Sequence, residues 1–209
     1  SAATDFDGTP LTGGAERAVT VSLVDNASTT VTGTGALEMV GTTGATTTVQ
    51  HTGSGSYNFL VDGGVIDWDT YAFRDLPFGG IRVAGTPTVT SLARGDFEVN
   101  QDGGTAIDLD IATVDANPSL SIPDTRFARV APANAAVNVR LNATSTNAWQ
   151  FTDSYGNVAG EDFDVDGVGA CGSIRWDNSS CLLVEQTEYR WRNDDGGIGV
   201  PNDEWFDDS

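Results

Sequence analysis

Lysine is absent from this 209-residue sequence, whose ten basic side chains are all arginines and stand against 30 acidic ones. The formal net charge of −20 excludes nucleic acid as a default partner and disfavours an acidic membrane surface. No stretch approaches the roughly 18 apolar residues that a membrane span needs, so we expect no membrane insertion. Isopeptide crosslinks that require lysine cannot form within this chain.

Histidine, methionine and cysteine are also scarce, with one, one and two residues. A single histidine, His51, and two cysteines do not suffice for a closed Cys/His zinc site, and no nucleophile elbow accompanies His51, which we expect on a strand surface. The only methionine is Met39, whereas the chain starts with Ser-Ala-Ala, which resembles the product side of a small-residue cleavage site. These features favour a secreted protein.

Two further features agree with an extracellular location. Cys171 and Cys181 flank a short turn-rich stretch, and their spacing predicts a disulfide that contributes about 2 to 3 kcal/mol; the alternative is two buried free thiols. Asn26, Asn142 and Asn178 each begin an Asn-X-Ser/Thr sequon and are glycosylation candidates.

The apolar pattern predicts an all-β protein. No window of helical length has apolar residues at i, i+3, i+4 and i+7 without an interrupting glycine or proline, whereas alternation with period 2 recurs throughout. Short strands separated by Gly, Asp, Asn and Pro fit a β-sandwich or a β-solenoid. We expect strands at residues 18–24, 29–32, 37–40, 46–51, 57–61, 65–69, 81–84, 88–92, 97–100, 106–111, 126–130, 137–142, 149–152, 173–176 and 182–191.

An internal repeat favours the solenoid. Residues 64–85, 86–112 and 119–142 each read as strand, turn, aromatic-bearing strand, turn and strand. Their equivalent phenylalanines, Phe73, Phe97 and Phe127, are 24 and 30 residues apart, which suits one coil of a β-solenoid per repeat. We therefore expect a solenoid domain over residues 1–180 and a C-terminal strand with an acidic, aromatic tail over residues 181–209.

The later part of the chain resembles a known family. The segments Trp-Gln-Phe-Thr at 149–152, Gly-Asn-Val-Ala-Gly-Glu-Asp-Phe-Asp at 156–164 and Ile-Arg-Trp at 174–176 look like the last coils of right-handed parallel β-helix proteins of bacterial surfaces. Tyr-Arg-Trp-Arg-Asn-Asp-Asp-Gly-Gly at 189–197 resembles a segment that often follows such β-helices. The resemblance implies a right-handed parallel β-helix at the cell surface or outside the cell, and it supplies no catalytic residues.

One segment carries the pattern of a metal site. Asp162, Asp164 and Asp166 alternate along the chain before a glycine, and Glu161 precedes them. This spacing allows a tight loop to place oxygen ligands around calcium, although Ser173 stands where an EF-hand has its glutamate. We therefore predict calcium as the cofactor; the alternative is an extended segment whose three aspartates face water together.

Large aromatic side chains stand near the C-terminus. Tyr189, Trp191, Trp205 and Phe206 lie in a polar, acidic context, which suggests a partner surface. The strand at 182–191 either folds back to cover the last coil or extends to a neighbouring subunit by strand addition.

These observations predict a non-enzymatic structural protein. We expect a secreted subunit that assembles with copies of itself into a filament or surface layer, by coil stacking or by exchange of a terminal strand. An adhesin fragment of a larger surface protein is a second possibility.

A carbohydrate-binding or polysaccharide-degrading β-helix is a third possibility. In that case Trp68, Tyr71 and Trp149 would stack on sugars, although these three rings equally suit the interior of the fold or a turn. The carboxylate pairs Asp67/Asp69 and Asp108/Asp110 would face the polysaccharide.

Overall fold

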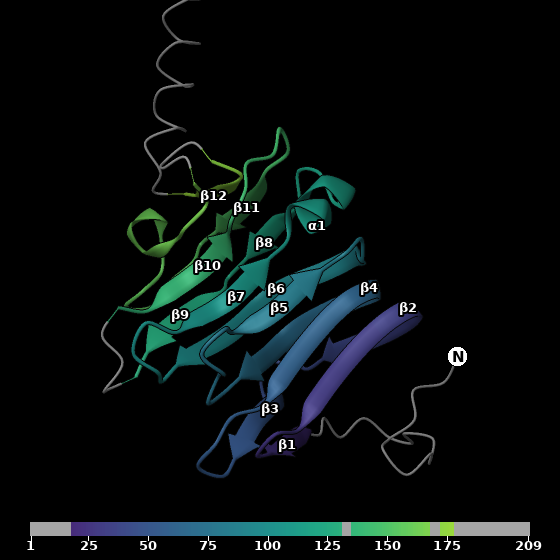
Figure 1. The fold of residues 1–209 in the computed structure, drawn as a ribbon, viewed down its shortest axis with the longest axis vertical. Coiled ribbons are helices and arrows are strands. Elements are labelled where there is room, and N and C mark those ends of the chain that lie inside the picture. Colours follow the sequence, from purple (N-terminus) through teal and green to yellow (C-terminus); the bar gives the residue numbers. More distant parts are fainter. Residues whose placement is uncertain (1–17, 131–134, 168–171, 178–209) are drawn as a thin grey trace, which may run out of the picture.

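A computed structural model of the protein describes residues 18–130, 135–167 and 172–177 (Figure 1). Within these ranges the chain forms twelve strands, one short α-helix and one 3-10 helix. The strands are β1 Thr20–Val24, β2 Ser28–Val40, β3 Thr47–Thr52, β4 Asn58–Phe73, β5 Ile81–Ala84, β6 Thr88–Val99, β7 Thr105–Leu109, β8 Ser121–Pro123, β9 Arg126–Arg129, β10 Val137–Leu141, β11 Trp149–Thr152 and β12 Ile174–Trp176; α1 spans Ile111–Ala116 and the 3-10 helix η1 spans Glu161–Phe163.

The protein is a parallel β-solenoid of about five turns, as the sequence predicts. All ten pairings between the named strands are parallel. The strands lie side by side from β1 and β2 at one end to β11 and β12 at the other (Figure 1). The β-sandwich alternative is excluded, because a sandwich is built from antiparallel sheets.

Three strands are longer than the sequence predicts. Strand β4 pairs with β5 through residues 60–62 and then with β6 through residues 65–69 and 71–73, so it follows the coil around a corner. Gly63 and Gly64 form that corner with φ of 102° and 78°, and a Cβ on Gly64 would lie 2.1 Å from the carbonyl oxygen of Gly35. The strands expected at 57–61 and 65–69 are therefore one bent strand, and β2 and β6 merge expected strands in the same way.

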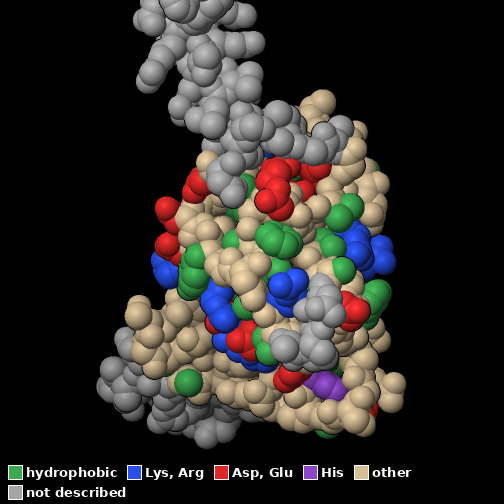
Figure 2. All heavy atoms as spheres, turned by 90° about the vertical axis from the view of Figure 1, so that its left-hand side faces the viewer, with side chains coloured by type: hydrophobic (Ala, Val, Ile, Leu, Met, Phe, Trp, Pro, Cys, Tyr) green, Lys and Arg blue, Asp and Glu red, His purple; other side chains and the backbone are tan. Residues whose placement is uncertain are grey.

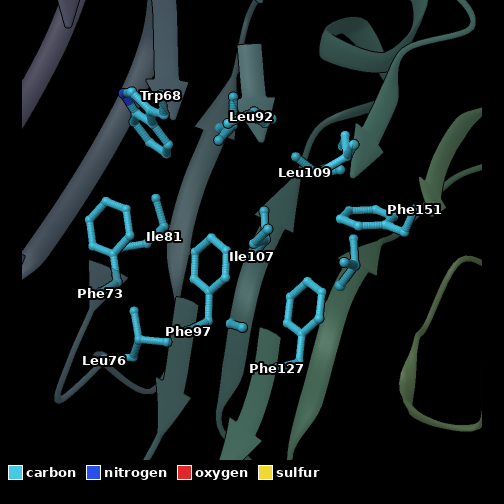
Figure 3. Close-up of a cluster of buried hydrophobic side chains, with 14 of the residues drawn as sticks. Trp68, Phe73, Leu76, Ile81, Leu92, Phe97, Ile107, Leu109, Phe127 and Phe151 are labelled. Carbon is cyan, nitrogen blue, oxygen red and sulfur yellow. The ribbon is translucent and has the colours of Figure 1, made fainter. Parts of the chain in front are cut away.

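A column of phenylalanine rings runs through the core and confirms the predicted repeat. Phe97 is register-paired with both Phe73 and Phe127. The rings of Phe73 and Phe97 stack with centroids 5.7 Å apart, and those of Phe97 and Phe127 with centroids 5.4 Å apart (Figure 3). In the last two described coils Phe151 stacks on its register partner Trp176, with ring centroids 4.6 Å apart. The spacings of 24 and 30 residues are thus the lengths of successive coils.

Helix α1 is a departure from the sequence prediction, which extends a strand to residue 111. The helix replaces a strand on one face of its coil and buries Thr113 and Val114. The Thr113 hydroxyl donates to the carbonyl oxygens of Val83 and Gly85 in the neighbouring coil. Alternation between apolar and acidic residues does not reveal where a chain leaves the sheet, and here it leaves after Leu109.

One corner has the same unusual backbone in four successive coils. Thr70, Arg94, Asp124 and Asp153 have φ between 53° and 57°, in the left-handed region that side chains with a Cβ rarely adopt. The strand register places these four residues at equivalent positions. The corner therefore presents a row of outward side chains along the solenoid.

The phenylalanine column predicts a large effect of one substitution. Phe97→Ala should lower the free energy of unfolding by about 3 to 5 kcal/mol, because it removes a fully buried ring between two others. Urea unfolding followed by tryptophan fluorescence measures this loss.

The control is Phe78→Ala, since Phe78 is 56% exposed and its loss should change the unfolding free energy by no more than about 0.5 kcal/mol. Equal effects of the two substitutions would contradict the stacked core.

Candidate functional site

The acidic segment at 161–166 folds as a loop against the last described strand. Glu161 and Asp162 lie in η1, and the backbone is extended at Asp164. The indole Nε1 of Trp176 donates to Asp164 Oδ2 at 2.7 Å, and the amide of Ile174 donates to Asp166 Oδ2 at 3.2 Å. The loop is thus held on β12 through two of its carboxylates.

The structure excludes the alternative in which the three aspartates face water together on one strand face. Asp166 is only 2% exposed. Its carboxylate packs so closely on Gly172 that a Cβ there would lie 1.4 Å from Oδ2. Figure 2 shows acidic side chains grouped near the β12 end of the molecule, but Asp166 lies inside the fold.

Burial makes two carboxyl groups of this loop, those of Asp164 and Glu161, difficult to ionise. Removal from water raises the pKa of Asp164 to about 7, against the hydrogen bond from Trp176, and the charges of Glu161 and Asp166 add to the rise. Burial and the charges of Asp166 and Asp162 also raise the pKa of Glu161. Such a cluster favours the uptake of a proton or of a cation with oxygen ligands.

The carboxylates of the acidic loop are not arranged as a metal-binding group within the described ranges. Glu161 has two buried carboxylate oxygens that find no hydrogen-bond partner within the described ranges. No group of three or more His, Cys, Asp or Glu side chains in the described part of the chain is arranged to hold a metal ion. Calcium binding at Glu161, Asp162, Asp164 and Asp166 therefore stays a prediction.

The opposite end of the solenoid has an open sheet edge. Among the described strands, β1 pairs only with β3, and β2 only with β4. The amide of Asn58 donates to the Ala27 carbonyl oxygen at 2.8 Å. This bond shows which residues of β2 direct their peptide groups toward β4. Because peptide groups alternate sides along a strand, those of Ser28, Thr30 and Thr32 face the open edge.

This first coil is also unusually apolar on its outside. Four of the eight large hydrophobic side chains that are exposed in the described part of the chain lie here: Val19, Val21, Val24 and Val40. Strand β2 spans 13 residues, contains no proline and carries one charged residue, Glu38. The edge thus lacks most of the features that normally protect a sheet from strand addition.

The aromatic residues expected to stack on sugars are buried. Trp68, Tyr71 and Trp149 are at most 1% exposed. The Trp149 indole donates to the Asn117 carbonyl oxygen, so this side chain is fixed inside the fold. Of the two alternatives for these rings, the structure shows the interior position and excludes a sugar platform. Period-2 alternation does not separate the two, because it does not distinguish the inner face of a coil from the outer one.

The expected carboxylate pairs lie among arginines. Asp69 forms an ion pair with Arg94, and Asp110 lies 3.5 Å from Arg82. Burial raises the pKa of Asp108, while the nearby arginines Arg140 and Arg82 lower it. Ion pairing gives Asp69 and Asp110 a structural role, whereas the absence of enzymatic activity stays a prediction.

His51 is not the surface residue that its sequence context suggests. Its side chain is 8% exposed and stacks on Tyr57 with ring centroids 5.7 Å apart. Its Nε2 lies 2.8 Å from Asp25 Oδ1, and the same oxygen accepts a hydrogen bond from the amide of Gly55. Asp25 thus fastens the turn after β1 to strand β3 through His51 and to the loop after β3 through Gly55.

Several expected site residues fall outside the described ranges. These are the disulfide candidates Cys171 and Cys181, the sequon residue Asn178, and the contact residues Tyr189, Trp191, Trp205 and Phe206. The sequon residues Asn26 and Asn142 are described and exposed, and Asn26 occupies a corner with φ of 63°.

A groove that the sequence does not reveal runs across the coils. It has a volume of about 440 Å³ and is lined by residues from five coils, among them Thr46, Arg74, Arg94, Asp124 and Tyr155. The sequence does not reveal the groove because its lining residues come together only when the register of all five coils is known. The repeat in the sequence covers three coils.

Comparisons with protein-family models, with curated proteins and with solved structures find no match for this chain. In the described residues, no helix is both long and apolar enough to cross a membrane.

The acidic loop predicts a specific pH dependence. A carboxyl group whose pKa is near 7 when folded and 3.8 when unfolded keeps its proton only in the folded state between these values. The free energy of unfolding should therefore fall as the pH rises from about 4 to about 7 and then level off. Asp164→Asn should make this fall shallower in urea titrations that contain a chelator.

Asp62→Asn is the control, because Asp62 is exposed and far along the chain from the acidic loop. Parallel pH profiles for wild type and Asp164→Asn would contradict the raised pKa.

Proposed function

We propose that the protein is a secreted, non-enzymatic structural subunit that assembles with copies of itself into an extracellular filament or surface layer. The observation that carries this proposal is the open edge of the first coil, where β1 and β2 each have one free side among the described strands and carry a single charged residue, Glu38. The exposed valines next to this edge give a second copy apolar surface to bury.

The geometry of the edge suits a second copy of the same chain. A β-solenoid repeats one coil outline, so a strand from another copy can continue the parallel ladder of β2 without a new backbone geometry. The two ends of one molecule differ, because one is rich in valine and threonine and the other is acidic and aromatic. A contact between unlike ends does not close on itself and generates a filament.

Calcium has a defined place in this proposal. The ion binds at the loop with Glu161, Asp162, Asp164 and Asp166, where raised pKa values show that the negative charges of Asp164 and Glu161 are poorly compensated, and where both carboxylate oxygens of Glu161 find no partner within the described ranges. Oxygen ligands of this kind suit calcium. Neutralising the loop lets another copy approach a chain of net charge −20.

The predicted disulfide and aromatic tail complete the proposed subunit. The Cys171–Cys181 bridge stabilises the chain after the acidic loop. Tyr189, Trp191, Trp205 and Phe206 contact the neighbouring subunit.

Thr30→Pro tests the edge directly. Proline removes an amide that faces the open edge, so it should leave the β2–β4 ladder intact and prevent a strand from docking. Negative-stain electron microscopy and sedimentation velocity should show filaments for the wild type and single particles for Thr30→Pro.

Thr30→Ala is the matched control, because it loses the same hydroxyl but keeps the amide, and it should assemble like the wild type. Unchanged melting temperatures would show that all three proteins are folded. Filaments of Thr30→Pro, or single particles of the wild type with and without calcium, would refute assembly through this edge.

Calcium binding has its own test. Adding calcium should raise the melting temperature of the wild type, since a ligand that binds only the folded state stabilises it. Asp166→Asn should abolish this shift, whereas Asp62→Asn should retain it. A chelator should disperse wild-type filaments, and a calcium response in Asp166→Asn equal to that of the wild type would argue against the site.

A further inference from the structure

The groove of about 440 Å³ lies along the corner at which Thr70, Arg94 and Asp124 occupy the left-handed backbone region. It extends from the coil of β3 to the coil of Tyr155, four coil steps away. Since neighbouring strands are about 4.8 Å apart, the groove is roughly 19 Å long. It is therefore long enough for several units of an extended polymer.

Two arginines in the groove are fixed by ion pairs. Arg74 Nη2 lies 2.6 Å from Asp96 Oδ2, and Arg94 forms an ion pair with Asp69. Arg94 Nε also donates to the Thr70 hydroxyl at 3.1 Å. The guanidinium groups are thus held in place, and each has five N–H donors, more than these contacts use.

Charge pairing decides which ligands suit this groove. Asp69 and Asp96 offset the charges of Arg74 and Arg94, so the groove has no excess of positive charge for a polyanion. Figure 2 shows basic and acidic side chains close together on a side of the molecule, in keeping with such pairing. Together with the threonine hydroxyls of Thr46 and Thr70, the groove offers closely spaced donors and acceptors to a neutral, hydroxyl-rich ligand.

An exposed aromatic ring lies at one end of the groove. Tyr155 is 56% exposed and lines the groove. Its amide donates to the Thr125 carbonyl oxygen at 3.1 Å, and its carbonyl oxygen accepts from the amide of Phe127 at 2.8 Å, so the ladder fixes its backbone. A tyrosine combines an apolar ring face with a polar hydroxyl, which suits the apolar face and the hydroxyl rim of a sugar ring.

We propose that this groove binds a neutral polysaccharide chain that runs along the solenoid. A sugar ring packs on Tyr155, and the sugar hydroxyls bond to Arg74, Arg94 and Asp124. The site is separate from the open edge and from the acidic loop, so glycan binding does not depend on assembly.

Affinity electrophoresis tests the proposal. The full-length protein is run in native gels that contain hydroxyethyl cellulose, galactomannan, dextran or polygalacturonate, with a gel without polymer as the reference for self-assembly. At least one of the three neutral polymers should retard the protein, and the polyanion polygalacturonate should not. The retarding polymer should bind Tyr155→Ala roughly tenfold more weakly, because the stacking ring is lost.

Two variants make the test specific. Phe78→Ala removes an aromatic side chain that is also 56% exposed but does not line the groove, and it should bind like the wild type. Tyr155→Phe keeps the ring and should retain most of the affinity. The proposal is overturned if no neutral polymer retards the protein, if only polygalacturonate does, or if Tyr155→Ala and Phe78→Ala bind equally well.

Discussion

The parallel hydrogen-bond ladder between successive coils is the constraint on which the rest of this structure depends. Because each residue lies next to its equivalent in the coils above and below, side chains repeat in columns rather than in one mixed core. Phe73, Phe97 and Phe127 form such a column inside, and the left-handed corner residues form another outside. Core, groove and ion pairs all follow from the same register.

The same ladder distinguishes the two ends of the molecule from its middle coils. Strands β4, β5, β6 and β7 are each paired on two sides, whereas β1 and β2 have one open side among the described strands. At the other end, the ladder presents the Phe151–Trp176 stack, the half-buried carboxyl group of Asp164 and the buried carboxylate of Asp166. A proton or a cation at that end changes its charge, so the two ends respond differently to the solution.

The sequence predicts the solenoid because its repeat places an aromatic residue at the same point of three coils, and the structure confirms Phe73, Phe97 and Phe127 as equivalent. It does not predict that Trp68 and Tyr71 point inward, since alternation assigns faces only relative to one another. It also misses α1, where a coil face is helical, and the groove, whose residues come from five coils. Local sequence patterns therefore predict the coil. The groove is predicted only when the register between successive coils is known.

Amide hydrogen exchange during assembly is the measurement that tests the central claim most directly. In the dilute protein the amides of Ser28, Thr30 and Thr32 face the open edge and should exchange rapidly, while their β2 neighbours are protected by β4. In the assembled protein these three amides should become protected, because a strand of a second copy covers them. Assembly without any gain in protection at β2 would contradict the account.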